Sequence, residues 1–280
     1  HDIYIVDYHN HPNATMEIGR LRELSFRNAG GGTGKSYDLD EFDTREEAFY
    51  KQLIVWEPEE KKIIGGYRFM LGNDVINSSK YNNTATNNLF DFSSDFYSKT
   101  LGLTIELGRS FVQPEYQPSS GNRKAIFSLD NLWDGLGALV VDHPEIKYFF
   151  GKVTMYLDFH KKGRDLILGF INHFFKDKNQ WISAKQPLEL HHDIGYFIEQ
   201  IQELDYKESY KILTKKLKEL NCSIPPLIAA YMNLSSSMKT FGTAMNSKFG
   251  DVEETGILIS IDDIYPEKKD RHVNTYKKAK

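Results

Sequence analysis

Hydrophobic and polar positions along this chain change period several times, which is typical of a protein that mixes helices and strands. In residues 15–28 the apolar positions recur at mostly helical spacing, after candidate capping residues Asn13 and Thr15. The runs 52–58 and 62–71 are rich in β-branched and aromatic residues around a charged turn, and they predict a β-hairpin. The stretch 72–88 is rich in Asn and Ser and predicts an exposed loop.

Strand-like and helix-like segments alternate in the rest of the chain. The predicted strands are 103–112, 146–155 and 255–261, and the predicted helices are 124–141, 164–175 and 206–220. An antiparallel hairpin followed by such alternation favours a mixed central sheet covered by helices on both faces. We therefore predict an α+β fold (mixed α/β) in a single domain that spans residues 1–280.

Composition and charge narrow the class of function. The chain has 280 residues, of which 40% are hydrophobic, so it can bury a sizeable core. Its net charge of −4 gives no overall attraction to nucleic acid, and we expect no nucleic-acid partner. Cys222 is the only cysteine, which excludes an intrachain disulfide and favours a reducing, cytoplasmic setting. No run of apolar residues reaches the length of a membrane span.

The segment AGGGTGKS, residues 29–36, has the spelling of a nucleotide-binding P-loop. A working P-loop needs a buried strand before it and a helix after it, because loop amides and the helix N-terminus converge on phosphate. Here the preceding segment is amphipathic and charged, and Asp38 and Asp40 follow Lys35, where they would repel phosphates. The pattern favours a glycine turn, and the ATPase alternative predicts nucleotide binding that depends on Lys35.

The predicted strand 103–112 carries two charged residues, Glu106 and Arg109, that a buried strand would normally avoid. Glu106 is therefore a candidate for acid–base work or for binding an ammonium group, with a structural ion pair as the alternative. The turn 117–123 feeds the next helix, and its amides together with Arg123 form a candidate phosphate site.

The motif ELGRSFVQPEYQ, residues 106–117, resembles the signature of the hemolysin-like branch of the GNAT superfamily. Members of that branch are N-acyltransferases that use acyl carrier protein to make ornithine lipids and other aminoacyl lipids. Further motifs follow the family's order from about residue 15 to 263, including a block at 225–261 in which a Pro-Pro helix leads to a closing strand. The spacing of the charged positions also resembles that of the acyl-homoserine lactone synthases, a related branch.

The resemblance implies a GNAT-like mixed sheet and direct attack of a substrate amine on an acyl thioester. It assigns Glu106 to binding or deprotonating the amine, with Arg109 and Ser110 as further catalytic residues and backbone amides at 110–112 as donors to the oxyanion. The implied acceptor-binding residues are Arg22, Phe26, Asp40, Asp43 and Arg68. The implied donor-binding residues are Phe111, Val112, Ser119, Gly121 and Arg123.

Two positions depart from the family motif. Phe111 and Gln113 stand where the family usually has Cys and His, which argues against an acyl-cysteine intermediate or a histidine base there. The expected donor is the 4′-phosphopantetheine thioester of acyl carrier protein, or acyl-CoA, with no bound cofactor. We expect no metal, because the histidine clusters at 1–12 and 191–193 lack a complete ligand set.

The expected partners are acyl carrier protein and an amino-acid acceptor of the ornithine or glycine type. Because the product of such a reaction is hydrophobic, we also expect peripheral association with the inner face of the cytoplasmic membrane. The main alternative is a catalytically inactive GNAT-like module that binds acyl carrier protein or lipid. Thiol release distinguishes the two hypotheses, because only an enzyme should release the free carrier thiol when an amino acid is added.

Overall fold

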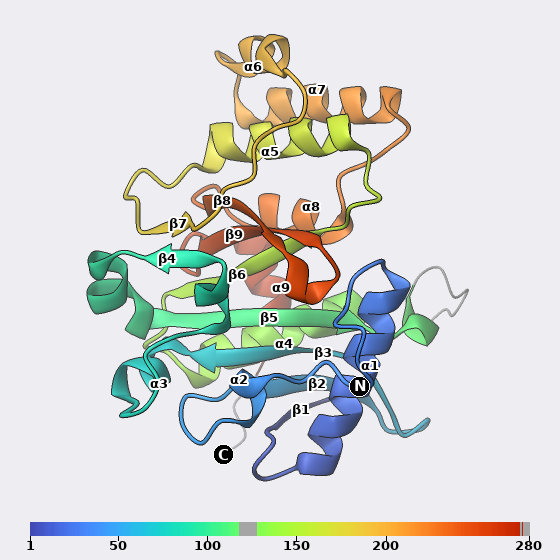
Figure 1. The fold of residues 1–280 in the computed structure, drawn as a ribbon, viewed down its shortest axis with the longest axis vertical. Coiled ribbons are helices and arrows are strands. Elements are labelled where there is room, and N and C mark those ends of the chain that lie inside the picture. Colours follow the sequence, from blue (N-terminus) through green and yellow to red (C-terminus); the bar gives the residue numbers. More distant parts are fainter. Residues whose placement is uncertain (118–127, 275, 277–280) are drawn as a thin grey trace.

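A seven-stranded mixed sheet forms the centre of the molecule in the computed structural model, which describes residues 1–117, 128–274 and 276 (Figure 1). In spatial order the strands are β1 (Asp2–Val6), β2 (Lys51–Glu57), β3 (Lys62–Leu71), β5 (Thr104–Val112), β6 (Tyr148–Met155), β9 (Val252–Ser260) and β8 (Lys239–Asn246). β5 and β6 run parallel, and the other neighbouring strands are antiparallel. A second small sheet pairs β4 (Phe90–Phe92) with β7 (Ile182–Ala184).

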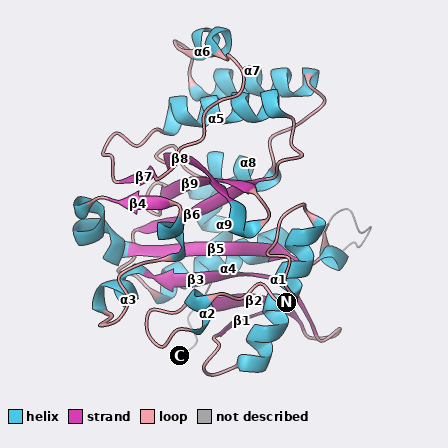
Figure 2. Cartoon of the chain, viewed as in Figure 1, coloured by secondary structure: helices cyan, strands magenta, loops and turns pink. Residues whose placement is uncertain are grey.

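Helices cover both faces of the sheet, as Figure 2 shows. The helices of the described residues are α1 (Pro12–Asn28), α2 (Glu41–Thr44), α3 (Gly72–Asn77), α4 (Ser128–Asp142), α5 (Lys161–Phe175), α6 (Gly195–Ile201), α7 (Tyr206–Glu219), α8 (Pro226–Met232) and α9 (Pro266–His272). Of these, α6 and α7 pack on α5. Alternate residues of β2 divide between two cores: Leu53 and Val55 pack in the core that contains α4, and Ile54 packs in the core that contains α1. The predicted mixed sheet with helices on both faces is confirmed.

The predicted loop at 72–88 is partly wrong. Residues Gly72–Asn77 form α3, and Ala85–Asn88 form a single 3₁₀ turn whose residues Ala85 and Thr86 are buried. The Thr84 side chain accepts a hydrogen bond from the Thr86 amide, so polar side chains satisfy the backbone that they bury. Polar composition therefore marked a capped turn packed inside the molecule, rather than a solvated loop.

The parallel strands β5 and β6 separate halfway along their length. Their pairing runs from Thr104 beside Tyr148 to Leu107 beside Gly151, although both strands continue beyond these residues. On its other side β5 remains paired with β3 as far as Val112. The split between the two strands opens the sheet at its centre and exposes side chains of both strands to one space.

Candidate active site

A β-bulge changes the direction of the side chains of β5 near the split. The register against β3 shifts between Gly66 and Arg68, and Arg109 has a φ of 52°, a conformation that non-glycine residues seldom adopt. Gly65 makes room for this geometry, since a Cβ there would lie 2.3 Å from the carbonyl oxygen of Phe111. The bulge therefore turns Arg109 out of the regular alternation of the strand.

Two cavities, each of about 620 Å³, meet at the split. They share Arg68, Ala85, Arg109 and Lys152. The first, which we call the apolar cavity, is lined mainly by Phe26, Leu107, Phe111, Val112, Met155, Tyr156, Phe159, Leu227 and Phe249, with Glu106, Ser110 and Glu254 among its polar residues. The second, which we call the polar cavity, is lined by Lys35, Asp38, Asp40, Glu41, Asn88, Gln186, Asn246 and Lys248 among others.

Five residues predicted from the sequence come together in one buried cluster, which a sixth, Asp38, completes. This arginine–aspartate network consists of Arg22, Arg68, Arg109, Asp38, Asp40 and Asp43. Asp38 is its hub, because its carboxylate lies 3.0 Å from Arg22 Nε and 2.9 Å from Arg109 Nε. Burial alone would raise the pKa of Asp38, yet the neighbouring arginines hold it below its usual value.

The local fold of residues 40–43 explains how two aspartates reach Arg68. Asp40 is the N-cap of α2 and accepts a hydrogen bond from the Phe42 amide at 3.0 Å, while Asp43 accepts one from the Asp40 amide at 3.1 Å. This capping box turns both carboxylates toward Arg68, whose Nη1 lies 2.9 Å from Asp40 and 3.2 Å from Asp43. Burial acts to lower the pKa of Arg68, but Asp40 and Asp43 raise it well above its ordinary value.

Glu106 lies on β5 at the split and is 2% exposed. Its Oε1 accepts hydrogen bonds from the Thr86 amide at 3.1 Å and from the Thr86 hydroxyl at 2.8 Å. Its Oε2 is buried and makes no hydrogen bond of regular geometry among the described residues, although the Tyr50 hydroxyl lies beside the carboxylate. Burial and the nearby Glu106 carboxylate raise the pKa of Tyr50 well above its ordinary value, which keeps that hydroxyl protonated. A buried carboxylate oxygen without a partner can accept a hydrogen bond from a bound ligand.

Lys152 is a second charged residue at the split, and it was not predicted from the sequence. It follows Gly151, the last residue of β6 that pairs with β5. Its Nζ lies 3.4 Å from the Thr86 hydroxyl and 3.7 Å from the Glu254 carboxylate, and its side chain is 14% exposed. The feature of the sequence that could have indicated this residue is a single lysine inside the mostly apolar run YFFGKVTM.

The other predicted site residues fall into three groups. Phe26, Ser110, Phe111 and Val112 line the apolar cavity, so Phe26, which the resemblance assigns to the acceptor, lies in the same cavity as the predicted donor-binding residues Phe111 and Val112. Arg22 and Asp43 are fully buried and contact other members of the network. Ser119, Gly121 and Arg123 lie outside the described residues.

The glycine turn does not have the architecture of a P-loop. A helix, α1, precedes it, and Gly30, Gly32 and Gly34 have positive φ. The Glu23 carboxylate accepts hydrogen bonds from the Thr33 amide at 2.8 Å and the Gly34 amide at 2.9 Å. These amides are therefore occupied by a carboxylate of the chain itself, which argues against the ATPase alternative.

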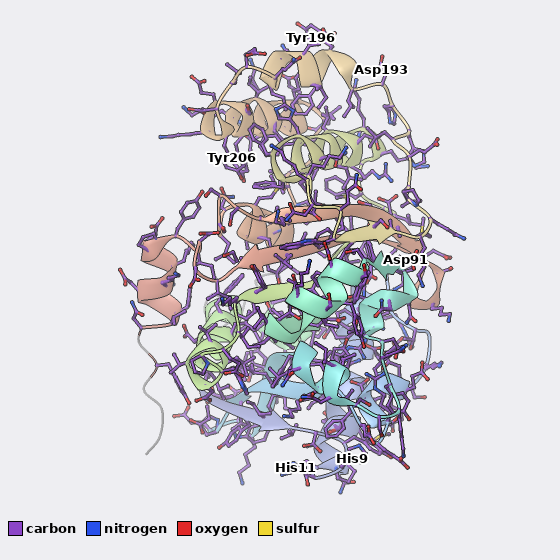
Figure 3. The ribbon with its side chains drawn as sticks, turned by 90° about the vertical axis from the view of Figure 1, so that its left-hand side faces the viewer. His9, His11, Asp91, Asp193, Tyr196 and Tyr206 are labelled. Carbon is purple, nitrogen blue, oxygen red and sulfur yellow. The ribbon has the colours of Figure 1, made fainter. Side chains whose placement is uncertain are left out.

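The two histidine clusters lie at opposite ends of the molecule. Figure 3 shows His9 and His11 at its lower end and Asp193 at its upper end. His192 Nδ1 lies 2.8 Å from the buried carboxylate of Asp165, and His9 Nε2 lies 3.0 Å from the Arg45 carbonyl. Within the ranges that the structure describes, no three His, Cys, Asp or Glu residues are grouped to hold a metal ion.

Comparisons with known proteins show which family the chain belongs to. The model of the Acetyltransferase (GNAT) domain matches residues 21–125, which include the whole network and the bulge. A protein of Bacteroides thetaiotaomicron named glycine N(alpha)-acyltransferase is 51% identical over 98% of this chain and 81% of its own length. One of Phocaeicola vulgatus with the same name is 50% identical over 99% of this chain and 85% of its own.

Among solved structures, a CoA-dependent acyl-homoserine lactone synthase with S-adenosylmethionine and isopentyl-CoA has a TM-score of 0.42 at 10% identity, over 96% of this chain and 85% of that one. Across the described residues, none of the helices is both long and apolar enough to cross a bilayer.

The family assignment depends on the sequence relatives, whose identity extends over almost the whole chain. The prediction of an acyltransferase is confirmed: the chain is an N-acyltransferase with a GNAT domain and belongs to the family of these glycine N(alpha)-acyltransferases.

Proposed function

We propose that this enzyme transfers a fatty acyl group from a thioester donor to the α-amine of glycine and forms an N-acylglycine for aminolipid synthesis. The donor is a 3-hydroxyacyl group on the 4′-phosphopantetheine arm of acyl carrier protein, with acyl-CoA as the alternative carrier. The names of two relatives at 51% and 50% identity favour glycine over ornithine as the acceptor.

The apolar cavity is suited to the donor. Its walls are mainly aromatic and aliphatic, and its volume of about 620 Å³ is in the range of small-molecule sites. An acyl chain in this cavity would bring its thioester to the bulge, where the amides of residues 110–112 are candidate donors to the oxyanion. Phe111 provides no nucleophile at the position where the family motif usually has cysteine, which favours direct attack by the amine.

The observation that carries the proposal is the unpartnered Oε2 of Glu106, which lines the apolar cavity. In the proposed reaction the glycine ammonium donates a hydrogen bond to this oxygen and then loses a proton to Glu106, directly or through water. The nitrogen lone pair attacks the thioester carbonyl and forms the C–N bond. The nitrogen then loses a second proton to water. The tetrahedral state collapses with cleavage of the C–S bond, and the thiolate takes up the proton held by Glu106.

The test uses the full chain with one 3-hydroxyacyl group loaded on acyl carrier protein or on CoA. Each donor is combined with glycine, ornithine, serine, S-adenosylmethionine or buffer, and N-acyl products and free thiol are measured by mass spectrometry and thiol titration. We expect N-acylglycine and one equivalent of thiol per product. Lactone formation from S-adenosylmethionine would instead support a homoserine lactone synthase, and donor binding without product from any amine would support an inactive module.

Peripheral membrane association follows from the amphiphilic product and is tested separately. Co-sedimentation with anionic lipid vesicles should increase when the acyl donor and glycine are both supplied. Equal recovery in the supernatant with and without substrates would contradict this part of the proposal.

A further inference from the structure

The acceptor has two charged groups, and the site must distinguish an amino acid from a simple amine. The arginines that the sequence assigns to the acceptor carboxylate are already engaged. Arg22 is fully buried within the network, and Arg68 faces both carboxylate oxygens of Asp40 at 2.9 Å. Arg109 pairs with Asp38 and stacks over the Phe249 ring at 3.9 Å. An incoming carboxylate would have to compete with an aspartate at each of them.

Lys152 is placed differently. Its ammonium has three donors, of which one lies within hydrogen-bond distance of Thr86, and its carboxylate neighbour Glu254 is 3.7 Å away. Glu254 also accepts a hydrogen bond from Asn246 at 3.1 Å. Lys152 lines both cavities, so its ammonium can reach a ligand that extends from one into the other.

One hydroxyl joins Lys152 to the proposed base. The Thr86 Oγ1 accepts from Lys152 Nζ and donates to Glu106 Oε1. This bridge fixes a positive group and a negative group close together at the split. In glycine the ammonium and carboxylate are likewise close, because a single carbon separates them.

We propose that Lys152 binds the α-carboxylate of the acceptor while Glu106 holds its amine, and that Lys152 thereby selects free amino acids over amines without a carboxylate. This inference rests on the proposed function. It makes Lys152 a specificity-determining residue, whereas a role in stabilising the oxyanion or positioning Glu106 would affect every acceptor equally.

The test compares glycine with glycinamide, which keeps the amine and lacks the carboxylate. Lys152→Met should lower kcat/KM for glycine on the order of 10- to 100-fold, mainly through KM, because it removes a charge-assisted hydrogen bond. The value for glycinamide should change less than about 3-fold, so the preference for glycine collapses. Lys152→Arg, which keeps the positive charge, should recover part of that preference.

Lys239→Met is the matched control, because Lys239 is a partly buried lysine of the same sheet, 3.4 Å from Asp177 and outside both cavities. It should leave the ratio of the two acceptors unchanged, and thermal melting verifies that each variant is folded. If Lys152→Met does not fold, Lys152→Gln takes its place.

An equal fall for glycine and glycinamide with unchanged KM would overturn the inference, as would a collapse of the preference in Arg109→Met but not in the Lys152 variants. Formation of N-acylglycine by the wild-type enzyme reports separately on the proposed function. Failure of the inference can therefore be told apart from failure of the proposed function.

Discussion

Two clusters of buried charge lie beside the split in the sheet, and they differ in how closely opposite charges are paired. In the arginine–aspartate network each arginine lies within 3.5 Å of at least one aspartate, although Arg22 Nη2 and Arg68 Nε have no hydrogen-bond partner among the described residues. At the split, Glu106 has a buried oxygen without a partner among the described residues, and Lys152 has only long contacts. Because burying charge is costly, close pairing of opposite charges indicates a role in holding the fold, and a buried carboxylate without such a pair indicates a role in binding a ligand.

The positions of the two clusters agree with this division. The network ties α1 and residues 38–43 to β3 and to the bulge at Arg109. It can therefore keep the bulge in its strained conformation. Glu106 and Lys152 lie on the two strands that separate, and each lines the space between them.

The largest expected effect comes from Glu106→Gln. This change keeps the shape and the contacts with Thr86 but removes the proton acceptor, so we expect kcat/KM for glycine to fall about 10²–10⁴-fold. The free energy of unfolding should change by about 1 kcal/mol or less, because an incompletely paired charge is removed. Steady-state kinetics and urea unfolding provide the two measurements.

Glu253→Gln is the control for that variant. Glu253 is also a buried strand glutamate, but it pairs with Arg164 at 2.7 Å and lies outside both cavities. The Glu253→Gln variant should have a lower free energy of unfolding than the wild type and an unchanged kcat/KM for glycine. Normal turnover in Glu106→Gln would show that its carboxylate is not the base.

Asp38→Asn should show the opposite pattern. It leaves Arg22 and Arg109 without their shared partner in a buried place, and breaking such a pair typically costs about 3–5 kcal/mol of stability. Urea unfolding at neutral pH measures this loss. A change as small as that of Glu106→Gln would contradict the distinction between the two clusters.

Acid should weaken the network selectively. The arginines hold the pKa values of Asp38 and Asp40 below their ordinary values in the folded state, against the opposing effect of burial. Such groups stabilise the fold above the unfolded-state pKa of about 3.9, and this contribution is lost as the pH falls through the folded-state pKa. The stability difference between wild type and Asp38→Asn should therefore shrink below about pH 4. A constant difference from pH 7 to pH 3 would argue against this assignment.

Much of the site could be predicted where the sequence carries local signals. A glutamate and an arginine within an apolar strand indicated Glu106 and Arg109, and the strand itself was predicted to within one residue. The spacing of Asp40 and Asp43 reappears as a capping box, so a local backbone preference places both carboxylates. The predicted hairpin is confirmed within a residue at each end.

The rest depends on contacts between residues far apart in the chain. Thr86 reaches Glu106 from a segment predicted as a solvated loop, and Asp38 was considered only as a charge that would repel phosphate. Lys152 reaches the site because β5 and β6 separate just before it, and no local sequence pattern predicts where two strands separate. Strands β1 and β8 were missed, since the residues of β1 are mostly exposed and β8 contains a glycine with positive φ.

The smallest expected effect is that of Lys35→Ala. This substitution removes a positive charge that belongs to neither cluster. Lys35 lies at the rim of the polar cavity with an exposed side chain, so its loss should change stability by less than about 0.5 kcal/mol. Because Glu23 occupies the amides of the glycine turn, the variant and the wild type should show the same lack of ATP binding in equilibrium dialysis. A modest change in KM for glycine would place Lys35 on the entry path of the acceptor, whereas ATP binding that requires Lys35 would restore the P-loop interpretation.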